Sequence, residues 1–332
     1  MASSARRRAF GVTALVLAMV GWGLTFSLNR LLLRDTAMAG EPWPGLSLTV
    51  LRFAVVAPVM LAWAIAILWR RRRQLRRDIL ALCGLGLFGV IGYYLTANTA
   101  QVYASASMNA VLHQMTPLVA FAGGVLVLRE KLTFAKGLGV IVALGAAVAY
   151  SLLEAGADFQ GDNIPLAVML LFLTALDWTL YMLIAKRLLV RWSPTDVSVV
   201  GNALGLVMLL PLAEALRPWG LGVRWSILAE LSPTHWIVVL YLAFGAGLLC
   251  YILYNAGLRI IEASRAAVFA YLLVPAAMVS ALWLPGDLRE PLSLWKCLCA
   301  AGIIAGVALV TLKPPRDPPP AAPRETADHA SA

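Results

Sequence analysis

Two proline-containing stretches interrupt otherwise apolar sequence with residues that can bind, transfer protons or bend a helix. The first reads AVLHQMTPLVAF and places His113 four residues before Pro117. The second reads AVFAYLLVPAAM and places Tyr271 four residues before Pro275. A proline inside a helix frees the carbonyl one turn earlier and kinks the helix. We therefore predict a paired hinge at the two prolines, with His113 and Tyr271 as binding residues; a packing kink is the alternative.

Asp177 is an acidic residue near the middle of a long apolar run. Insertion of an aspartate at the centre of a membrane helix costs about 2.5–3.5 kcal/mol, so such residues are usually functional. We predict that Asp177 contacts substrate, and that Asp177 and His113 are candidates for proton coupling. A buried acid that is hydrogen-bonded to a neighbouring Trp or hydroxyl is the alternative.

Other polar and aromatic residues recur at helical spacing, which places them on one side of each helix. We predict that these stripes face a central cavity, where aromatic rings could stack against a flat ligand. The alternatives are interhelical hydrogen bonds for the asparagines and an interfacial belt for the aromatics. The predicted binding residues, besides the three above, are Trp22, Tyr94, Asn98, Asn109, Trp178, Tyr181, Tyr251, Tyr254 and Asn255.

The composition of the chain indicates a membrane protein. Its 332 residues are 61% hydrophobic and 13% charged, against about 45–50% and 25% in soluble domains. A spanning helix needs about 20 apolar residues. The runs that meet this length are 9–32, 45–69, 79–101, 105–128, 135–154, 164–188, 195–216, 234–257, 264–284 and 294–312.

The net charge of +10 reflects arginines and lysines that flank these runs. The chain has no stacking motif or basic domain, so we expect no nucleic-acid partner. With the N-terminus inside, 20 positive residues fall on the cytoplasmic side and six on the other side, which predicts cytoplasmic termini. The remaining one, Arg52, falls two turns into the second span. A substrate carboxylate or an acidic side chain could pair with it.

The two ends of the chain and the four cysteines also agree with a multi-span membrane protein. The basic N-terminus precedes an apolar run that is too long for a signal peptide and lacks a cleavage site, so we expect an uncleaved first span. The four cysteines lie in predicted spans without metal-ligand spacing, so we expect no disulfide framework, metal or cofactor. The Pro- and Ala-rich segment 313–332 is predicted to be a disordered cytoplasmic tail.

The sequence repeats itself weakly from one half to the other. YLTANTA recurs as YILYNAG, which pairs Tyr94 with Tyr251 and Asn98 with Asn255 at a shift of 157 residues. NRLLLR recurs as KRLLVR, the tryptophans at 22 and 178 correspond, and the two prolines correspond at nearly the same shift. Each half, 1–154 and 164–312, holds five spans. Because five is odd, the second half is inverted, and we predict ten helices as two inverted repeats around a central cavity.

Three motifs carry a resemblance that covers the chain from about Gly11 to Leu312. They are VGWGLTFSLNR, LRFAVVAPVML and MTPLVAFAGGVLVLREKLTFAKGLGVIVALGAAVAY. The chain resembles the drug/metabolite transporter superfamily, specifically its ten-helix EamA-type members. It departs from the family pattern where Glu290 follows PGDLR, and where Gly201 and Asn202 replace an Arg-Phe pair. Its aromatic content and length resemble YddG-type aromatic amino acid exporters.

The resemblance implies a secondary transporter of the bacterial inner membrane that exports small metabolites by alternating access, amino acids and aromatic ones in particular. Other metabolites or drugs, such as nucleoside-like compounds, are the alternative. The sequence has no Gly-x-x-x-x-Gly-Lys-[Ser/Thr] motif for ATP. An intramembrane enzyme is disfavoured because the three histidines form no metal or nucleophile motif. The expected partners are the substrate and the lipid bilayer; proton coupling, uniport and the oligomeric state, a monomer included, stay open.

Overall fold

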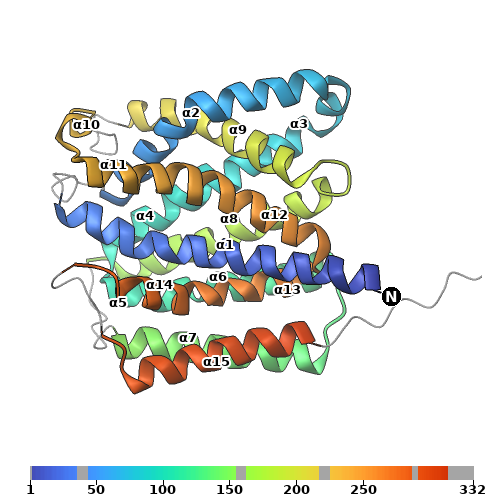
Figure 1. The fold of residues 1–332 in the computed structure, drawn as a ribbon, viewed down its shortest axis with the longest axis vertical. Coiled ribbons are helices and arrows are strands. Elements are labelled where there is room, and N and C mark those ends of the chain that lie inside the picture. Colours follow the sequence, from blue (N-terminus) through green and yellow to red (C-terminus); the bar gives the residue numbers. More distant parts are fainter. Residues whose placement is uncertain (1, 36–43, 155–161, 217–224, 286–290, 313–332) are drawn as a thin grey trace, which may run out of the picture.

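The described chain is a bundle of helices that lie side by side (Figure 1). Ten of its helical segments are long and apolar enough to cross a membrane, which confirms the predicted all-α fold. The computed structural model describes residues 2–35, 44–154, 162–216, 225–285 and 291–312. The predicted disordered tail lies outside these residues. The spans are Ala5–Leu32, Gly45–Arg70, Arg72–Tyr103, Met108–Val127, Phe134–Leu153, Ile164–Leu188, Pro194–Ala215, Pro233–Ile260, Ala263–Ala281 and Leu294–Thr311.

Some spans are single helices, and others change their helical geometry partway. The single helices are α1 (Ala2–Asp35), α2 (Pro44–Arg70), α7 (Phe134–Glu154), α8 (Ile164–Leu188), α9 (Pro194–Ala215) and α15 (Leu294–Leu312). The third span comprises α3 (Arg72–Gly86), the π-helical η2 (Leu87–Gly92) and α4 (Tyr93–Tyr103). The fourth comprises α5 (Ala106–His113) and α6 (Met115–Val127). The eighth comprises α11 (Pro233–Leu240), the π-helical η4 (Tyr241–Leu249) and α12 (Cys250–Ile260), after the short α10 (Ile227–Glu230). The ninth comprises α13 (Ala263–Val268), the 3₁₀ turn η5 (Phe269–Leu272) and α14 (Leu273–Ala281).

These interruptions fall at equivalent places in the two halves. A shift of 157 residues, read from the sequence repeat, carries η2 onto 244–249, which lies within η4. The same shift carries Gln114, the break between α5 and α6, onto Tyr271 in η5. The two halves therefore share their deviations from regular helix as well as their helix order.

The packing of the helices also shows that the two halves are equivalent. Helix α1 packs against α12 and α14, and its counterpart α8 packs against α4 and α6. The pairs α2 with α9 and α7 with α15 each join a helix to its own counterpart. The α7–α15 pair, at one edge of the bundle in Figure 1, depends on glycine: a Cβ on Gly139 or on Gly306 would lie 2.6 Å from the other's carbonyl oxygen. Small residues at such crossings let helix backbones approach closely.

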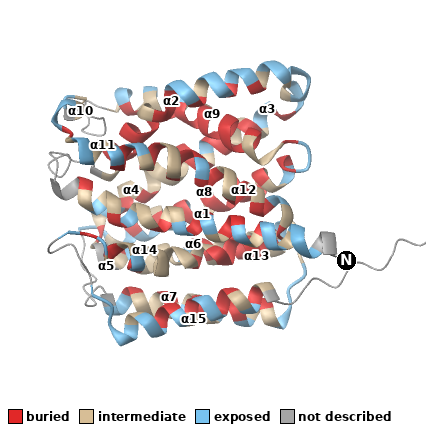
Figure 2. Ribbon diagram, viewed as in Figure 1, coloured by how far each residue is buried: buried red, intermediate tan, exposed pale blue. Residues whose placement is uncertain are grey.

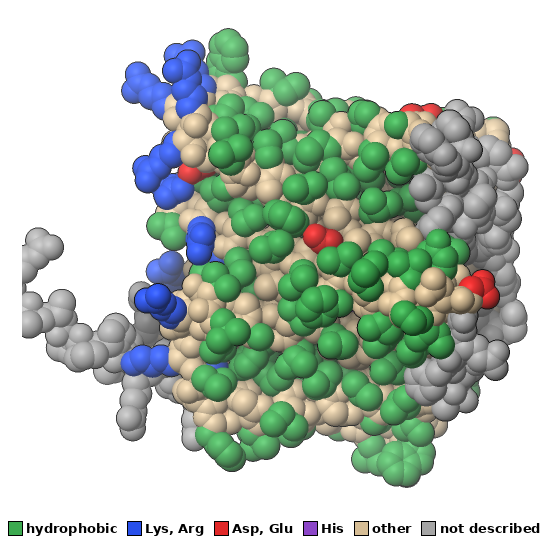
Figure 3. Space-filling view, turned by 180° about the vertical axis from the view of Figure 1, so that it is seen from behind, with side chains coloured by type: hydrophobic (Ala, Val, Ile, Leu, Met, Phe, Trp, Pro, Cys, Tyr) green, Lys and Arg blue, Asp and Glu red, His purple; other side chains and the backbone are tan. Residues whose placement is uncertain are grey.

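Side-chain chemistry changes along the bundle. Buried residues concentrate where helices face one another (Figure 2), and hydrophobic side chains cover the middle of the outer face (Figure 3). Lys and Arg side chains gather at one end of that face, which we call the basic end. An apolar outer belt with cations at one end suits a protein that crosses a bilayer.

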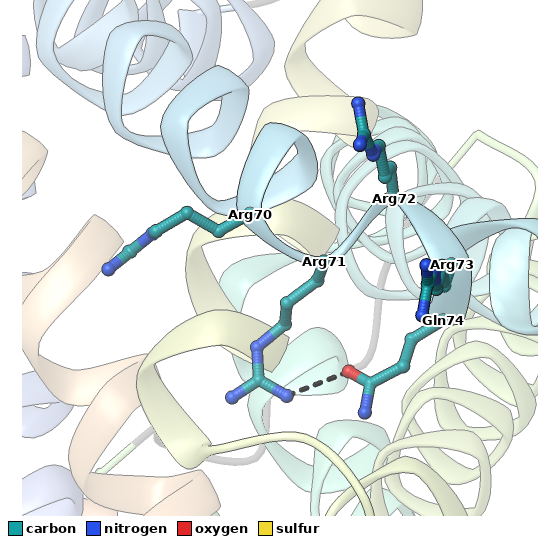
Figure 4. Close-up of a pocket in the computed structure, with 5 residues that line it drawn as sticks. All are labelled: Arg70, Arg71, Arg72, Arg73 and Gln74. Atoms are coloured by element: carbon teal, nitrogen blue, oxygen red, sulfur yellow. Dashed lines mark hydrogen bonds between the residues drawn. The ribbon is translucent and has the colours of Figure 1, made fainter.

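At the basic end, α2 passes into α3 through a run of arginines around a cleft of about 480 Å³ (Figure 4). Arg71 is fixed within this run: its guanidinium donates to Gln74 at 2.9 Å and pairs with Asp196 at 2.8 Å. The same guanidinium lies 5.3 Å from the ring of Trp192. These contacts join the second and third spans to the start of the seventh.

A second group of charges at the basic end joins the two halves, and we call it the basic-end network. The Glu130 carboxylate accepts hydrogen bonds from the N–H groups of Ala263 and Ser264, at 2.7 and 2.8 Å, and from the Ser264 hydroxyl. Such a carboxylate satisfies N–H groups that the start of α13 would otherwise leave unpaired. The other members of the network are Lys136, Lys186, Glu262 and Arg265.

Lys136 is almost fully buried in the basic-end network. Its ammonium pairs with Glu262 at 2.7 Å and donates to the Ser264 hydroxyl at 3.2 Å. Lys186 donates to the carbonyls of Leu258 and Ile261, both at 2.6 Å, where the eighth span ends. Cations near the last carbonyls of a helix are favourable because the helix dipole is negative there. The network therefore closes the basic end with paired charges.

Candidate functional site

Aromatic side chains from four spans meet in the interior of the bundle. Trp178 stacks on Tyr181, with ring centroids 5.2 Å apart, and lies 5.2 Å from Tyr254. Trp22 lies 5.2 Å from Tyr251 and 5.6 Å from Tyr254. We call the whole group the central aromatic cluster; it comprises Trp22, Tyr93, Tyr94, Trp178, Tyr181, Tyr251 and Tyr254.

Residues that correspond in the two halves contact each other within this cluster. Trp22 and Trp178 form an edge-to-face pair at 5.5 Å. Tyr251 donates its hydroxyl to the carbonyl of Gly89 at 3.1 Å and lies 3.5 Å from the Tyr94 hydroxyl, which therefore donates to it. Two equivalent positions of an inverted repeat can meet only at the axis that relates the halves. The cluster therefore lies on this axis.

The π-helical segments supply backbone acceptors to the cluster. A π turn leaves carbonyls outside the regular hydrogen-bond ladder, and such turns occur often at functional sites. In η2 the carbonyl of Gly89 accepts from Tyr251, and in η4 the carbonyl of Ala246 accepts from the indole of Trp22 at 2.9 Å. Gly89 and Ala246 are equivalent at the 157-residue shift. Each half therefore presents the same freed carbonyl to an aromatic residue of the other half.

The three predicted asparagines lie in different surroundings. Asn255 is buried below the cluster and donates to the hydroxyls of Tyr181 and Ser198, both at 2.8 Å. Asn98 donates to the carbonyl of Tyr94 at 2.7 Å, so its amide lies beside the cluster. Asn109 does not reach it: its amide donates to the carbonyls of Ala104 and Ser105, in the turn that starts α5.

His113 and Tyr271 lie at the two helix interruptions that precede the prolines. His113 ends α5, and its Nε2 is 3.4 Å from the hydroxyl of Tyr93. Tyr271 is buried in η5 and donates its hydroxyl to the carbonyl of Gln114 at 3.3 Å. A shift of 157 pairs Tyr271 with Gln114, whereas the proline spacing pairs it with His113. The structure thus links the two breaks through one hydrogen bond, close to Pro117 and Pro275.

Asp177 directly precedes Trp178 on α8, and no ring contact joins it to the central aromatic cluster in the described residues. Its carboxyl group lies against Gly92, the last residue of η2, where a Cβ would come within 2.6 Å of an Asp177 oxygen. The side chain is half-buried. The Asp177 carboxyl group therefore lies where α8 meets the end of η2.

The structure adds residues to the predicted group. Tyr93 contacts both Trp178, at 5.6 Å, and Tyr94, at 5.1 Å. The ring of Phe53 lies 5.6 Å from Tyr94, and the guanidinium of Arg52 lies over the Tyr94 ring at 4.6 Å. In the sequence, the one feature that could have indicated Tyr93 as a cluster member is its position next to Tyr94. Successive residues of a helix point about 100° apart, however, so this position does not place both rings on the same face. Only its contact with α8 shows that both rings belong to the cluster.

Within the described residues, no group of three or more His, Cys, Asp or Glu side chains is arranged to hold a metal ion. The cluster instead offers ring faces, hydroxyls and amides, with one guanidinium at its side. Such groups suit contact with a small organic molecule that has an apolar, planar part.

Comparison with known proteins identifies the family of this chain and agrees with its division into two similar halves. A model of the EamA-like transporter family matches residues 9–152 and, separately, residues 165–312. The chain belongs to the EamA-like transporter family. The two matches cover the two halves, which confirms that the transporter is an internal repeat of one five-helix unit.

Similar proteins cover most of the chain at low identity. An uncharacterized transporter of Archaeoglobus fulgidus is 25% identical over 90% of this chain and 98% of its own length. A probable terminal-alkyne amino-acid exporter of Streptantibioticus cattleyicolor is 27% identical over 90% of this chain and 92% of its own. A crystal structure with 21% identity superposes with a TM-score of 0.67 over 93% of this chain and 97% of that one, which supports the fold.

Proposed function

We propose that this transporter exports small metabolites, namely amino acids including aromatic ones, by alternating access across the bacterial inner membrane. The observation that supports this most directly is the central aromatic cluster on the axis between the halves. A site on that axis can be reached from either side when the two halves exchange conformations. The name of the Streptantibioticus cattleyicolor relative, an amino-acid exporter, agrees with the substrate class.

We place both termini in the cytoplasm, with the basic end facing inward. Lys and Arg collect at this end of the bundle, as the positive-inside rule requires for cytoplasmic ends. The paired breaks before Pro117 and Pro275 are the proposed hinges, because the regular helix is interrupted there in each half and a hydrogen bond from Tyr271 joins the two breaks. His113 and Asp177 are the proposed proton-coupling groups, since each touches a segment that also supports the cluster.

The transport reaction is a movement of substrate without covalent change, so we propose no enzymatic step. Other flat metabolites or drugs, including nucleoside-like compounds, remain the alternative substrates because ring faces bind them in the same way. Purified protein in proteoliposomes would be loaded with unlabelled amino acid, and uptake of radiolabelled amino acid by counterflow would be followed. We expect counterflow above empty vesicles for at least one aromatic amino acid. Counterflow with nucleosides alone would overturn the amino-acid assignment.

A further inference from the structure

Arg52 is the residue near the cluster whose charge is not accounted for by the fold. It lies in α2, within a membrane span, and only 6% of its surface is exposed. Its Nε is buried without a hydrogen-bond partner, and among the described residues no carboxylate forms an ion pair with it. Burial of a cation without an anion is unfavourable, and more so inside a membrane.

The contacts that Arg52 does make are with ring faces. Its guanidinium carbon lies 4.6 Å from the centre of the Tyr94 ring and 5.5 Å from that of Phe53. A cation over an aromatic face is attracted to it, but more weakly than to a carboxylate, and the ring occupies none of the N–H donors. The stacking therefore fixes the guanidinium in position and leaves hydrogen-bonding capacity free.

The position of Tyr94 connects this cation to the cluster. One face of the ring lies under Arg52, and the hydroxyl reaches Tyr251 at the axis between the halves. A guanidinium presents a planar fork of donors that matches the two oxygens of a carboxylate. A ligand with its carboxylate on Arg52 would therefore extend its remaining part over the aromatic rings.

We propose that Arg52 binds the carboxylate of the transported substrate, which makes the substrate a small carboxylate with an apolar group. This inference rests on the proposed transport function and makes it more specific, since it selects amino acids over neutral nucleosides and over amine drugs. A resident Asp or Glu would occupy the guanidinium permanently. A transported anion occupies it only while bound, which agrees with the lack of a carboxylate partner in the part of the chain that the structure describes.

The test separates the carboxylate from the rest of the ligand. Phenylalanine, 3-phenylpropionate, 3-phenylpropionamide and 2-phenylethylamine would compete for counterflow and would be tested for thermal stabilisation of the full chain in detergent. Proteins compared are the wild type, Arg52→Gln, Arg52→Lys and the matched control Arg70→Gln, an exposed arginine at the basic end. We expect Arg52→Gln to weaken binding of phenylalanine and phenylpropionate by about 10- to 100-fold. Arg52→Lys should lose less, and the amide and amine should be unaffected.

Two outcomes overturn the inference. One is equal loss of carboxylate and amine ligands in Arg52→Gln with normal folding, which would give Arg52 a structural role only. The other is a wild-type protein that does not distinguish phenylpropionate from its amide; this comparison needs no variant and stands even when Arg52→Gln does not fold. A third outcome separates the two proposals. If amino acids give no counterflow but phenylpropionate stabilises the wild type, and Arg52→Gln or Arg52→Lys loses this stabilisation, amino acids are not the substrates and Arg52 is still the carboxylate-binding residue.

Discussion

Two of the regions where the halves of the transporter meet have opposite chemistry, the central aromatic cluster and the basic-end network. In the network, Glu130 accepts from the backbone N–H groups of Ala263 and Ser264 at 2.7 and 2.8 Å, and Glu262 pairs with the buried cations Lys136 and Arg265, both at 2.7 Å. In the cluster, the halves touch through rings 5.2–5.6 Å apart and through hydroxyls. Charged pairs need specific geometry and are lost when one partner moves, whereas ring contacts tolerate rearrangement. The difference indicates that the network stabilises one arrangement of the halves and the cluster provides the binding surface.

The largest expected effect comes from the cluster itself. Trp178→Ala removes a ring that contacts Trp22, Tyr181 and Tyr254, and should cost about 3–5 kcal/mol of stability because it leaves a cavity. Transport should be abolished. Thermal unfolding in detergent and counterflow in proteoliposomes would measure the two effects. Trp178→Phe is the matched control and should retain transport; full activity in Trp178→Ala would exclude the cluster as the binding site.

The next largest effect should come from the network. Glu130→Ala removes the acceptor for Ala263 and Ser264 and should destabilise the protein by about 2–3 kcal/mol, since buried donors lose a charged partner. The melting temperature should fall, while the apparent affinity for substrate stays within a few-fold. Glu230→Gln, at an exposed glutamate, is the control. A larger effect on affinity than on melting temperature would contradict the separation of the two regions.

Asp177→Asn tests whether ionisation of Asp177, beside η2, couples transport to a pH gradient. The substitution keeps the shape of the side chain against Gly92 and removes only its ability to ionise. We expect loss of stimulation by a pH gradient with a stability change below about 1 kcal/mol. Counterflow, which needs no gradient, should remain. Asp162→Asn, at an exposed position, is the control, and gradient-driven transport equal to wild type in Asp177→Asn would remove Asp177 from the coupling mechanism.

The smallest effect concerns the acid sensitivity of the network. Burial alone would raise the pKa of Glu262, but hydrogen bonds and attraction from Lys136 and Arg265 outweigh it and hold the pKa below its usual value. Lys186 and Arg8 also interact with this carboxylate. A lowered folded pKa means that the stabilisation is complete above the unfolded value of about 4.3 and is lost as pH falls through the folded value.

This pH dependence is measurable as a difference between two proteins. The melting temperature of the wild type should exceed that of Glu262→Gln at pH 7, and the gap should shrink below about pH 4.3. A gap that stays constant from pH 7 to pH 3.5 would show that the Glu262 charge contributes nothing to stability.

The sequence predicted the spans and the membership of the cluster better than the contacts within it. Trp22, Tyr94 and Trp178 were identifiable because helical spacing and the repeat placed them on inward faces. Asn109 shared such a stripe but bonds to its own turn, because α5 starts beside it at the Ser105 cap.

The π-helical segments had no usable signal in the sequence. Their extra carbonyls are stable only because Tyr251 and Trp22 donate to them from the opposite half. Without those donors the regular helical ladder would satisfy more backbone groups, which a membrane strongly favours. The geometry of η2 and η4 is therefore a product of long-range packing.

The sequence by itself determined the ten apolar spans, the repeat and the excess of cations on one side, since each follows from local composition in a bilayer. The tertiary structure alone decided which equivalent residues meet at the axis, that Asp177 lies against Gly92 and that Arg52 stacks on Tyr94 with no anionic partner among the described residues. These are contacts between helices far apart in the chain, and their energies depend on distance and burial. Helical periodicity fixes the direction of a side chain but not the partner that it meets.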